Sequence, residues 1–246
     1  SGVMTDAADN NTAVGYRAGL VITSGDANTI VGSLAGDALT DGANNVIIGC
    51  VAGSTTTSVN EAVIIGKGAC ESGDVTAAAA GTVAIGRAAL LALTSGAGNT
   101  AIGYQALDAE DAGSYSTAVG YQALSAQNVD GTNGNTALGY KAGAAFTSSQ
   151  ANTVIGYNAA LTHTTGIRNI VIGFGAMDDT DAGSNSLDSE DNMFIGVDSG
   201  GGTWADADSD YNVGIGNYVM DAAMNDANYN TALGYSSLSA LTSGDS

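Results

Sequence analysis

The chain has 246 residues with 36 glycines, no proline, 3 phenylalanines and 1 tryptophan, so it lacks the large side chains that fill an ordinary globular core. It carries 25 acidic against 5 basic side chains, a formal charge of −20 that repels nucleic-acid phosphates and anionic lipid surfaces. No apolar run approaches the ~18 residues of a membrane span. We therefore expect neither nucleic-acid binding nor membrane insertion.

One short sequence recurs thirteen times, and residues 99–107, NTAIGYQAL, are a typical copy. Most central glycines are 17 residues apart, and the remaining spacings of 18, 19, 20 and 23 are all longer. A short period that varies only by insertion is typical of a solenoid, in which each copy forms one coil. The central glycines are Gly15, Gly32, Gly49, Gly66, Gly86, Gly103, Gly120, Gly139, Gly156, Gly173, Gly196, Gly216 and Gly234.

Along the chain, residues 1–10 form an N-terminal segment or junction before the first copy. A single solenoid domain is predicted over residues 11–240, followed by a C-terminal tail at 241–246. Two insertions interrupt the domain. The first is an acidic loop over about 177–191, and the second is a tryptophan-containing loop over about 199–211.

Two adjacent positions of every copy lack polar side chains. The residue directly before the glycine is always Val, Ile or Leu, as in Ile102, and is predicted to form the interior ladder. The residue two before the glycine, such as Ala101, is predicted to lie on the opposite face, because neighbours in a strand point to opposite sides. Each strand is therefore expected to be buried on both faces.

The second apolar face needs a cover, because one slim coil buries only its inside. We predict that identical chains supply it in a homo-oligomer, since thirteen exposed positions in a row would form a large apolar patch. The alternative is a two-sheet coil whose wide face folds back on itself. Ala106, at a position that is alanine in ten copies, indicates close approach of another backbone.

Asparagine stands four residues before the glycine in ten copies, including Asn99. Stacked asparagines at a coil corner can hydrogen-bond along the stack and tolerate left-handed backbone angles. We interpret this column as structural, with a polar ligand-binding row as the other interpretation. The predicted structural ladder of the typical copy comprises Asn99, Ala101, Ile102, Gly103 and Ala106.

Residues 11–16, 116–124 and 135–140 read NTAVGY, STAVGYQAL and NTALGY. These copies resemble the repeat of phage tail-fibre proteins and related surface proteins, and they are similar to the head repeats of trimeric autotransporter adhesins. The resemblance covers about residues 11–240. It implies a left-handed parallel β-roll of about 13 coils of about 17 residues, assembled as a homotrimer, although the adhesin heads use a shorter period.

Few residues suggest chemistry. The single histidine excludes a His-based catalytic pair or a multi-His metal site within one chain. Carboxylate pairs for glycoside hydrolysis could be drawn among the 25 acids, but most of these fall in solvent corners outside the strand columns, so we expect no enzyme and no cofactor. Asp206, Asp208 and Asp210 alternate as in an oxygen-rich calcium loop, but Tyr211 stands where an EF-hand needs glycine. The string is therefore no EF-hand, and a looser Ca²⁺ site between stacked corners is kept as the alternative to no bound ion.

Several side chains are candidates for contacts. Tyr104 and Tyr121 belong to an aromatic column directly after the glycine, which would form either a sugar-stacking face or a structural stack. Trp204 is the best single candidate for an exposed glycan contact. Cys50 and Cys70 lie in successive copies, either as a disulfide or as free thiols.

The rare basic residues form a further group. Four of the five lie one or two positions after a central glycine, where they could pair with carboxylates of a neighbouring coil or chain. These four are Arg17, Lys67, Arg87 and Lys141.

Two functional hypotheses follow. In the first, the protein is a structural fibre or appendage segment of a virion or cell surface. It is extracellular, associates with itself as a trimer or an end-to-end filament, and contributes to host or surface attachment. In the second, it is an adhesin module that binds glycans through the tyrosine column or the Trp204 loop.

Overall fold

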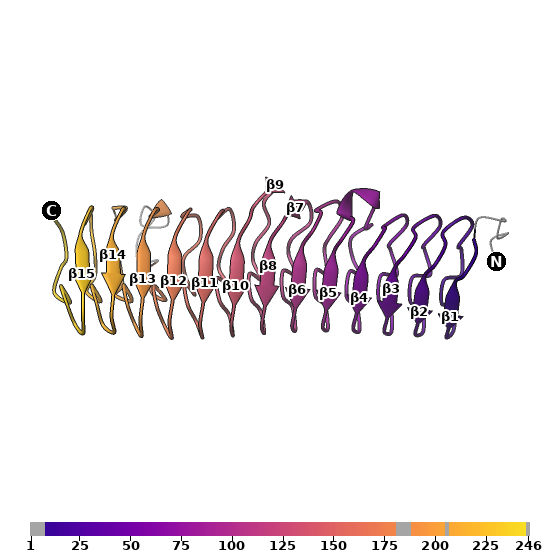
Figure 1. Cartoon of the computed structure of the whole chain (residues 1–246), viewed down its shortest axis with the longest axis horizontal. Helices are drawn as coiled ribbons and strands as arrows, with labels where there is room; N and C mark the ends of the chain where they lie inside the picture. Colours follow the sequence, from indigo (N-terminus) through magenta and orange to yellow (C-terminus); the bar gives the residue numbers. More distant parts are fainter. Residues whose placement is uncertain (1–7, 181–187, 205–206, 245–246) are drawn as a thin grey trace. The chain divides into compact units, whose positions relative to one another are not determined.

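A computed structural model describes residues 8–180, 188–204 and 207–244. Within these ranges the chain is an all-β protein, a parallel β-solenoid of about 13 turns with one strand of the main sheet in each turn (Figure 1). This confirms the predicted fold class at the level of an all-β parallel solenoid. Asp206 and the centre of the acidic insertion, 181–187, lie outside the described residues.

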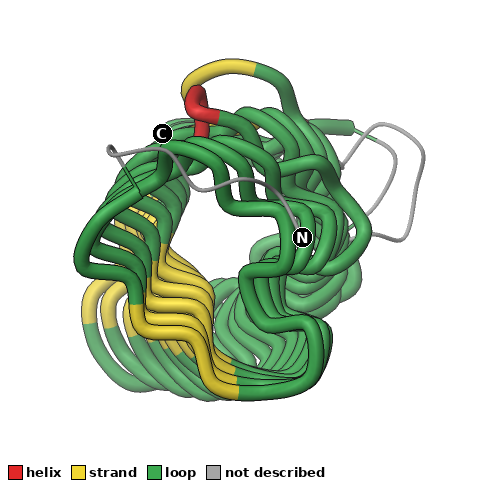
Figure 2. The backbone as a smooth tube through the Cα atoms, turned by 90° about the vertical axis from the view of Figure 1, so that its right-hand side faces the viewer, coloured by secondary structure: helices red, strands yellow, loops and turns green. Residues whose placement is uncertain are grey.

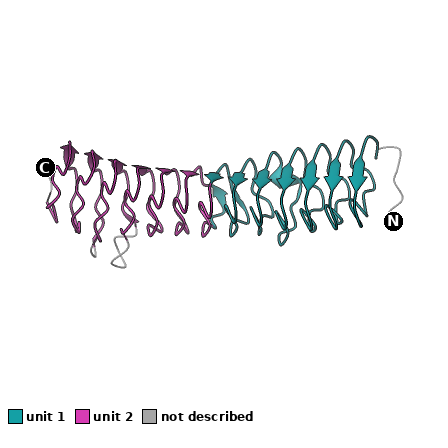
Figure 3. Cartoon of the chain, turned by 90° about the horizontal axis from the view of Figure 1, so that it is seen from below, with its two compact units in different colours: residues 1–119, 128–132 teal, residues 120–127, 133–246 magenta. Residues whose placement is uncertain are grey.

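The chain divides into two compact units that use the same coil (Figure 3). Unit 1 comprises residues 1–119 and 128–132, and unit 2 comprises residues 120–127 and 133–246. The main-sheet strands of unit 1 are β1 (Thr12–Val14), β2 (Thr29–Val31), β3 (Val46–Ile48), β4 (Val63–Ile65), β5 (Val83–Ile85), β6 (Thr100–Ile102) and β8 (Thr117–Val119). Those of unit 2 are β10 (Thr136–Leu138), β11 (Thr153–Ile155), β12 (Ile170–Ile172), β13 (Met193–Ile195), β14 (Val213–Ile215) and β15 (Thr231–Leu233).

Insertions leave the strand register unchanged. Within unit 2, Ile172 of β12 pairs with Ile195 of β13 although the two coils are 23 residues apart. In unit 1, the 3-10 helix η1 (Ala77–Ala79) and the short strand β9 (Gly131–Thr132) lie in coils lengthened by extra residues, whereas β7 (Gly113–Ser114), the parallel partner of β9, lies in a coil of ordinary length. These elements lie along one edge of the coil, away from the main strands (Figure 1).

From β2 to β15, the interior of each coil is lined by the middle residue of the main-sheet strand, two before the glycine. Ile30 and Ile47 are completely buried there, whereas Val14 and Leu138, directly before their glycines, are 59% and 48% exposed. The prediction that the residue before the glycine forms the interior ladder is therefore wrong, and the two faces are reversed. Ile102, assigned to the inner core from the sequence, is 37% exposed.

The reversal has a steric cause, because the middle strand residue packs against the residue four after the glycine. A Cβ added to Gly36 would lie 3.4 Å from Cδ1 of Ile30, and one added to Gly200 would lie 2.9 Å from Cδ1 of Phe194. In most coils a large residue at one position is matched by a small one at the other, which keeps the interior filled, although Ala137 with Gly143 and Val171 with Met177 depart from this pattern. Matched pairs are Ile30 with Gly36, Ile47 with Gly53, Ala84 with Leu90, Ala101 with Leu107, Phe194 with Gly200, and Gly214 with Met220.

The turns of the coil depend on positive φ angles. The central glycine Gly49 has φ 140°, and a Cβ there would lie 2.5 Å from the carbonyl oxygen of Gly66 in the next coil. Gly103 of the predicted ladder has φ 141°. Non-glycine residues also adopt left-handed angles, including Asn44, Val51 and Leu107. For Val51 and Leu107 this costs roughly 1–2 kcal/mol each, whereas asparagine tolerates such angles more readily. Turns and loops therefore make up most of each coil, and the strands lie on one side of it (Figure 2).

Candidate interaction surface

The strand side of each unit exposes two columns of residues, one directly before and one directly after the central glycine. We call these two columns the outer stripe. Large apolar side chains recur in it at high exposure, whereas soluble proteins seldom leave such contiguous apolar surface uncovered. Its exposed large apolar members are Val14, Tyr16 and Ile102 in unit 1, and Tyr121, Leu138, Tyr140, Tyr157, Phe174, Ile215, Leu233 and Tyr235 in unit 2.

Four aromatic rings of unit 2 form a continuous stack within the outer stripe. The ring centroids of Tyr121 and Tyr140 are 5.2 Å apart, those of Tyr140 and Tyr157 are 4.8 Å apart, and those of Tyr157 and Phe174 are 5.2 Å apart. The interplanar angles are 13°, 10° and 6°. The distances match the ~4.8 Å spacing of strands, so one ring per coil stacks on the next.

This aromatic stack has a consequence for sugar binding. A sugar packs on the face of an aromatic ring, but the faces of Tyr140 and Tyr157 are covered by their neighbours in the stack. The stack therefore presents ring edges and phenol hydroxyl groups to the outside. Its geometry favours a structural stack over a sugar-stacking face.

Trp204 is part of the core. Its side chain is completely buried, its Nε1 donates a hydrogen bond to the carbonyl oxygen of Gly200 at 3.1 Å, and its ring lies edge-on to Phe194 with centroids 5.9 Å apart. The prediction that Trp204 is an exposed glycan contact is therefore wrong. The Trp204 side chain lies inside the coil because burying a large indole with its N–H satisfied is strongly favourable.

The two cysteines do not form a disulfide. Cys50, directly after a glycine, is exposed on the outer stripe, whereas Cys70, four after a glycine, is buried inside the coil, and both are free thiols. Burial raises the pKa of Cys70 to about 12, so its thiol is unreactive at neutral pH. The disulfide alternative is excluded because the two columns face opposite sides of the coil wall.

Of the described residues of the proposed calcium loop, Asp210 makes an internal contact, whereas Oδ1 of Asp208 is buried without a hydrogen-bond partner in the described part of the chain. The Oδ1 atom of Asp210 accepts a hydrogen bond from the backbone amide of Glu190 at 2.8 Å. Burial, with a smaller contribution from Asp210 and Asp188, raises the pKa of Asp208. Among the residues that the structure describes, no three His, Cys, Asp or Glu side chains are grouped to hold a metal ion. Asp206, the third predicted ligand, is outside those residues.

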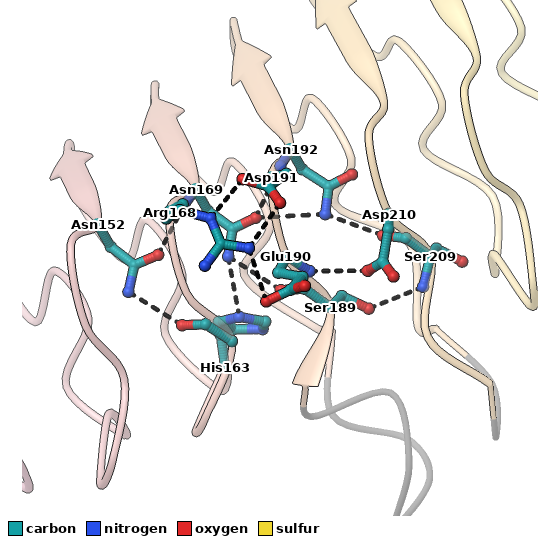
Figure 4. Close-up of polar contacts among 11 residues, drawn as sticks. Asn152, His163, Arg168, Asn169, Ser189, Glu190, Asp191, Asn192, Ser209 and Asp210 are labelled. Carbon is teal, nitrogen blue, oxygen red and sulfur yellow. Dashed lines mark hydrogen bonds and ion pairs between the residues drawn. The ribbon is translucent and has the colours of Figure 1, made fainter.

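The asparagine column is a buried, hydrogen-bonded ladder (Figure 4). The backbone amide of Asn192 donates to Oδ1 of Asn169 at 3.0 Å, and the Asn192 side-chain amide donates to the same atom at 3.2 Å and to the carbonyl of Ser209 at 2.8 Å. In the typical copy, Nδ2 of Asn99 donates to Gly113 at 2.6 Å. Because the amide groups bond to protein atoms, the ladder joins coils and does not present a ligand-binding row.

A charged cluster lies beside this ladder in unit 2. Nε and Nη2 of Arg168 donate to the two carboxylate oxygens of Asp191, both at 2.7 Å, and Nη2 lies 3.0 Å from Glu190 (Figure 4). The hydrogen bond to Arg168 lowers the pKa of Asp191. This exposed, bidentate pair joins the coil before the acidic insertion to the residues directly after it.

Comparisons with known proteins assign no family. No protein-family model matches the chain, and searches of curated proteins and of solved structures found no match. Among the described residues, no helix has the length and apolarity needed to cross a bilayer. The outer stripe has to be interpreted from its own chemistry.

Proposed function

We propose that the protein is a structural segment of an extracellular fibre or appendage on a virion or cell surface, and that identical copies pack through the outer stripe as a homotrimer. The observation that carries this proposal is the exposure of aliphatic residues at the position before the glycine. Val14, Leu138 and Leu233 occupy the same place in coils of both units. The resemblance of the repeat to tail-fibre and trimeric adhesin sequences supports the class and the number of chains.

The energetics favour such packing. Covering one fully exposed Leu, Ile or Val side chain contributes about 1.5–3 kcal/mol. Among the described residues directly before a central glycine, those that are exposed are Val14, Ile102, Leu138, Ile215 and Leu233, and the others are half-buried. The opposing effect is charge, because each chain carries −20 and like copies repel one another. We therefore expect assembly to strengthen as added salt screens this repulsion.

The mass of the protein in solution tests the proposal. One chain has a mass of 24.0 kDa, so light scattering should give 3 × 24.0 = 72 kDa for the trimer. The variant Leu138→Gln combined with Tyr157→Gln should lower that mass while its circular dichroism stays unchanged. Ala77→Gln, an exposed substitution in η1, is the matched control and should leave the mass unchanged. An intact chain that remains at 24.0 kDa with and without salt would reject the proposal.

The glycan-binding alternative has less support. Trp204 is buried, and the faces of Tyr140 and Tyr157 are covered within the aromatic stack. Attachment to a host or another surface, if this segment contributes to it, has to involve different residues. One group of side chains in unit 1 has suitable chemistry.

A further inference from the structure

A small cavity opens on the outer stripe of unit 1, where three successive coils meet. Its volume is about 360 Å³, and its lining includes Lys67 and Glu71 of one coil, Arg87 and Leu91 of the next, and Tyr104 of the third. Ligand pockets in proteins span roughly 300–1,000 Å³, so the cavity is at the small end of that range. It suits a ligand of about one sugar ring.

The cavity concentrates positive charge in a strongly acidic protein. Two of the 5 basic residues, Lys67 and Arg87, line it, although the chain carries 25 acids. In the described part of the chain, the salt bridges are formed by Arg17 and Arg168, and neither cavity cation forms one. Among the residues that the structure describes, no carboxylate forms a salt bridge with either cavity cation.

The guanidinium of Arg87 is held in place by an aromatic ring. Its Cζ lies 5.4 Å from the centroid of the Tyr104 ring, and its Nη1 donates to the Tyr104 hydroxyl at 3.4 Å. A guanidinium oriented in this way keeps further N–H groups for a planar acceptor, and a carboxylate matches that fork. The cation on Lys67, one coil earlier, can neutralise the same anion.

The remaining lining distinguishes between anions. Glu71 contributes an acceptor for hydroxyl groups and a negative charge that disfavours a doubly charged phosphate more than a singly charged carboxylate. Leu91 and Ala88 provide apolar contact for the C–H groups of a ring. We propose that this cavity binds the carboxylate and hydroxyl groups of an acidic sugar, such as a hexuronic acid.

The position of the cavity in the outer stripe is consistent with an open site. Lys67 and Arg87 follow their glycines directly, at the place that Tyr140 and Tyr157 occupy in unit 2. Burying two unpaired cations against an apolar face of a second copy would cost several kcal/mol. We expect this part of the stripe to stay uncovered, and the inference does not depend on the trimer.

Titration calorimetry of the full chain with glucuronate tests the inference. We expect one site per chain with a Kd on the order of 1 mM, as suits one ring and a few polar contacts. Glucose lacks the carboxylate and acetate lacks the hydroxyl groups, so both should bind at least ~10-fold more weakly. Arg87→Gln and Lys67→Gln should each weaken glucuronate binding ~10-fold or more. Arg17→Gln, whose cation pairs with Asp37, should not.

Three outcomes would overturn the inference. Glucuronate could bind no better than glucose, or acetate could bind as well as glucuronate, which would make this a general carboxylate site. Alternatively, Arg87→Gln could lower the mass measured by light scattering while glucuronate fails to bind the unmodified chain. In that case the carboxylate that Arg87 binds belongs to a second copy of the protein and not to a sugar. Each outcome leaves the trimer to be judged on its own mass measurement.

Discussion

The backbone amide of Asn169 donates to Oδ1 of Asn152 at 2.8 Å, and through such bonds each coil of the solenoid holds the next. The side-chain amide of Asn152 also donates to Oδ1 of Asn135 at 3.2 Å and to the carbonyl of Gly166 at 3.0 Å. One buried side chain therefore contacts the coil before it and the coil after it. Several predictions about stability depend on such links between coils.

Asn152→Ala should be strongly destabilising. It removes both bonds of the side-chain amide and leaves the buried amide of Asn169 without its acceptor, so we expect a loss of about 2–4 kcal/mol in urea unfolding. The matched control is Asn230→Ala, in the last strand-bearing coil, where the side chain donates to Asn212 and Gly244. It should lose only about 1 kcal/mol. The difference between the two variants reports the bond from the Asn169 amide to Oδ1 of Asn152, and equal losses would show that this bond adds no stability.

Gly49→Ala should prevent stable folding of its coil. The added Cβ would lie 2.5 Å from the Gly66 carbonyl oxygen, and φ at this position is 140°, which only glycine adopts readily. Gly81→Ala is the control, because φ is 74° there and nothing lies within 4 Å of the added Cβ. It should lower stability by only about 1 kcal/mol. Thermal unfolding of the two variants side by side checks this difference.

Ala151→Gly should stabilise the protein. Ala151 is exposed, has φ 57°, and occupies the position that Gly134 occupies one coil earlier with φ 62°. Relief of the left-handed strain exceeds the extra entropy of glycine in the unfolded chain, and we expect a gain of up to about 1 kcal/mol. Ala77→Gly in η1, where φ is not positive, should instead lose about 0.5–1 kcal/mol. A loss of stability in both variants would count against strain at Ala151.

His163 should make stability depend on pH. Burial lowers the pKa of this imidazole from 6.5 to about 4, against the opposing effects of Ser189 and Asp188. Between these values the unfolded chain binds the proton and the folded chain does not. The free energy of unfolding is therefore highest above pH 6.5. It falls by about 3 kcal/mol as the pH is lowered toward 4, because the unfolded chain gains a proton that the folded chain does not bind.

The variant His163→Gln isolates this effect. Burial raises the pKa values of Asp178, Asp198, Asp208 and Asp210, so these groups change stability in the opposite direction as the pH falls. They are present in both proteins, and the difference between the two unfolding curves removes most of their contribution. The stability difference between the unmodified chain and the variant should shrink as the pH is lowered from 7 to 4. A constant difference would show that His163 does not titrate as we expect.

The solenoid could be predicted from the repeat, but the inner face of its strands could not be predicted from apolarity alone. Ile30 and Val31 are both β-branched aliphatic residues, and hydrophobicity does not distinguish the buried Ile30 from the half-buried Val31. The distinguishing signal is in paired sizes along the chain. Ile30 is followed six residues later by Gly36, and Ala84 is followed six residues later by Leu90. Such compensation marks two residues that share the same space.

The contact residues were harder to predict because they depend on the path of the insertions. Trp204 stands in a glycine-rich insertion, where a tryptophan is as compatible with an exposed tip as with an inward fold. Packing of the Trp204 ring against Phe194, the middle residue of β13, places the indole inside the coil. The sequence alone does not show that these two rings meet. The cavity cations Lys67 and Arg87 could be placed beside the strands, but their convergence with Tyr104 requires the three coils to be stacked.

The unchanged register of β12 and β13 across a spacing of 23 residues has an implication for engineering. Added chain between two coils leaves the alignment of the strands on either side intact. A foreign peptide spliced into such an insertion would be carried at a defined height along the solenoid. Different peptides in successive insertions would be separated by multiples of about 4.8 Å, the strand spacing. The fold thus provides a scaffold with regularly spaced insertion sites, at which peptides that have no structure of their own can be displayed.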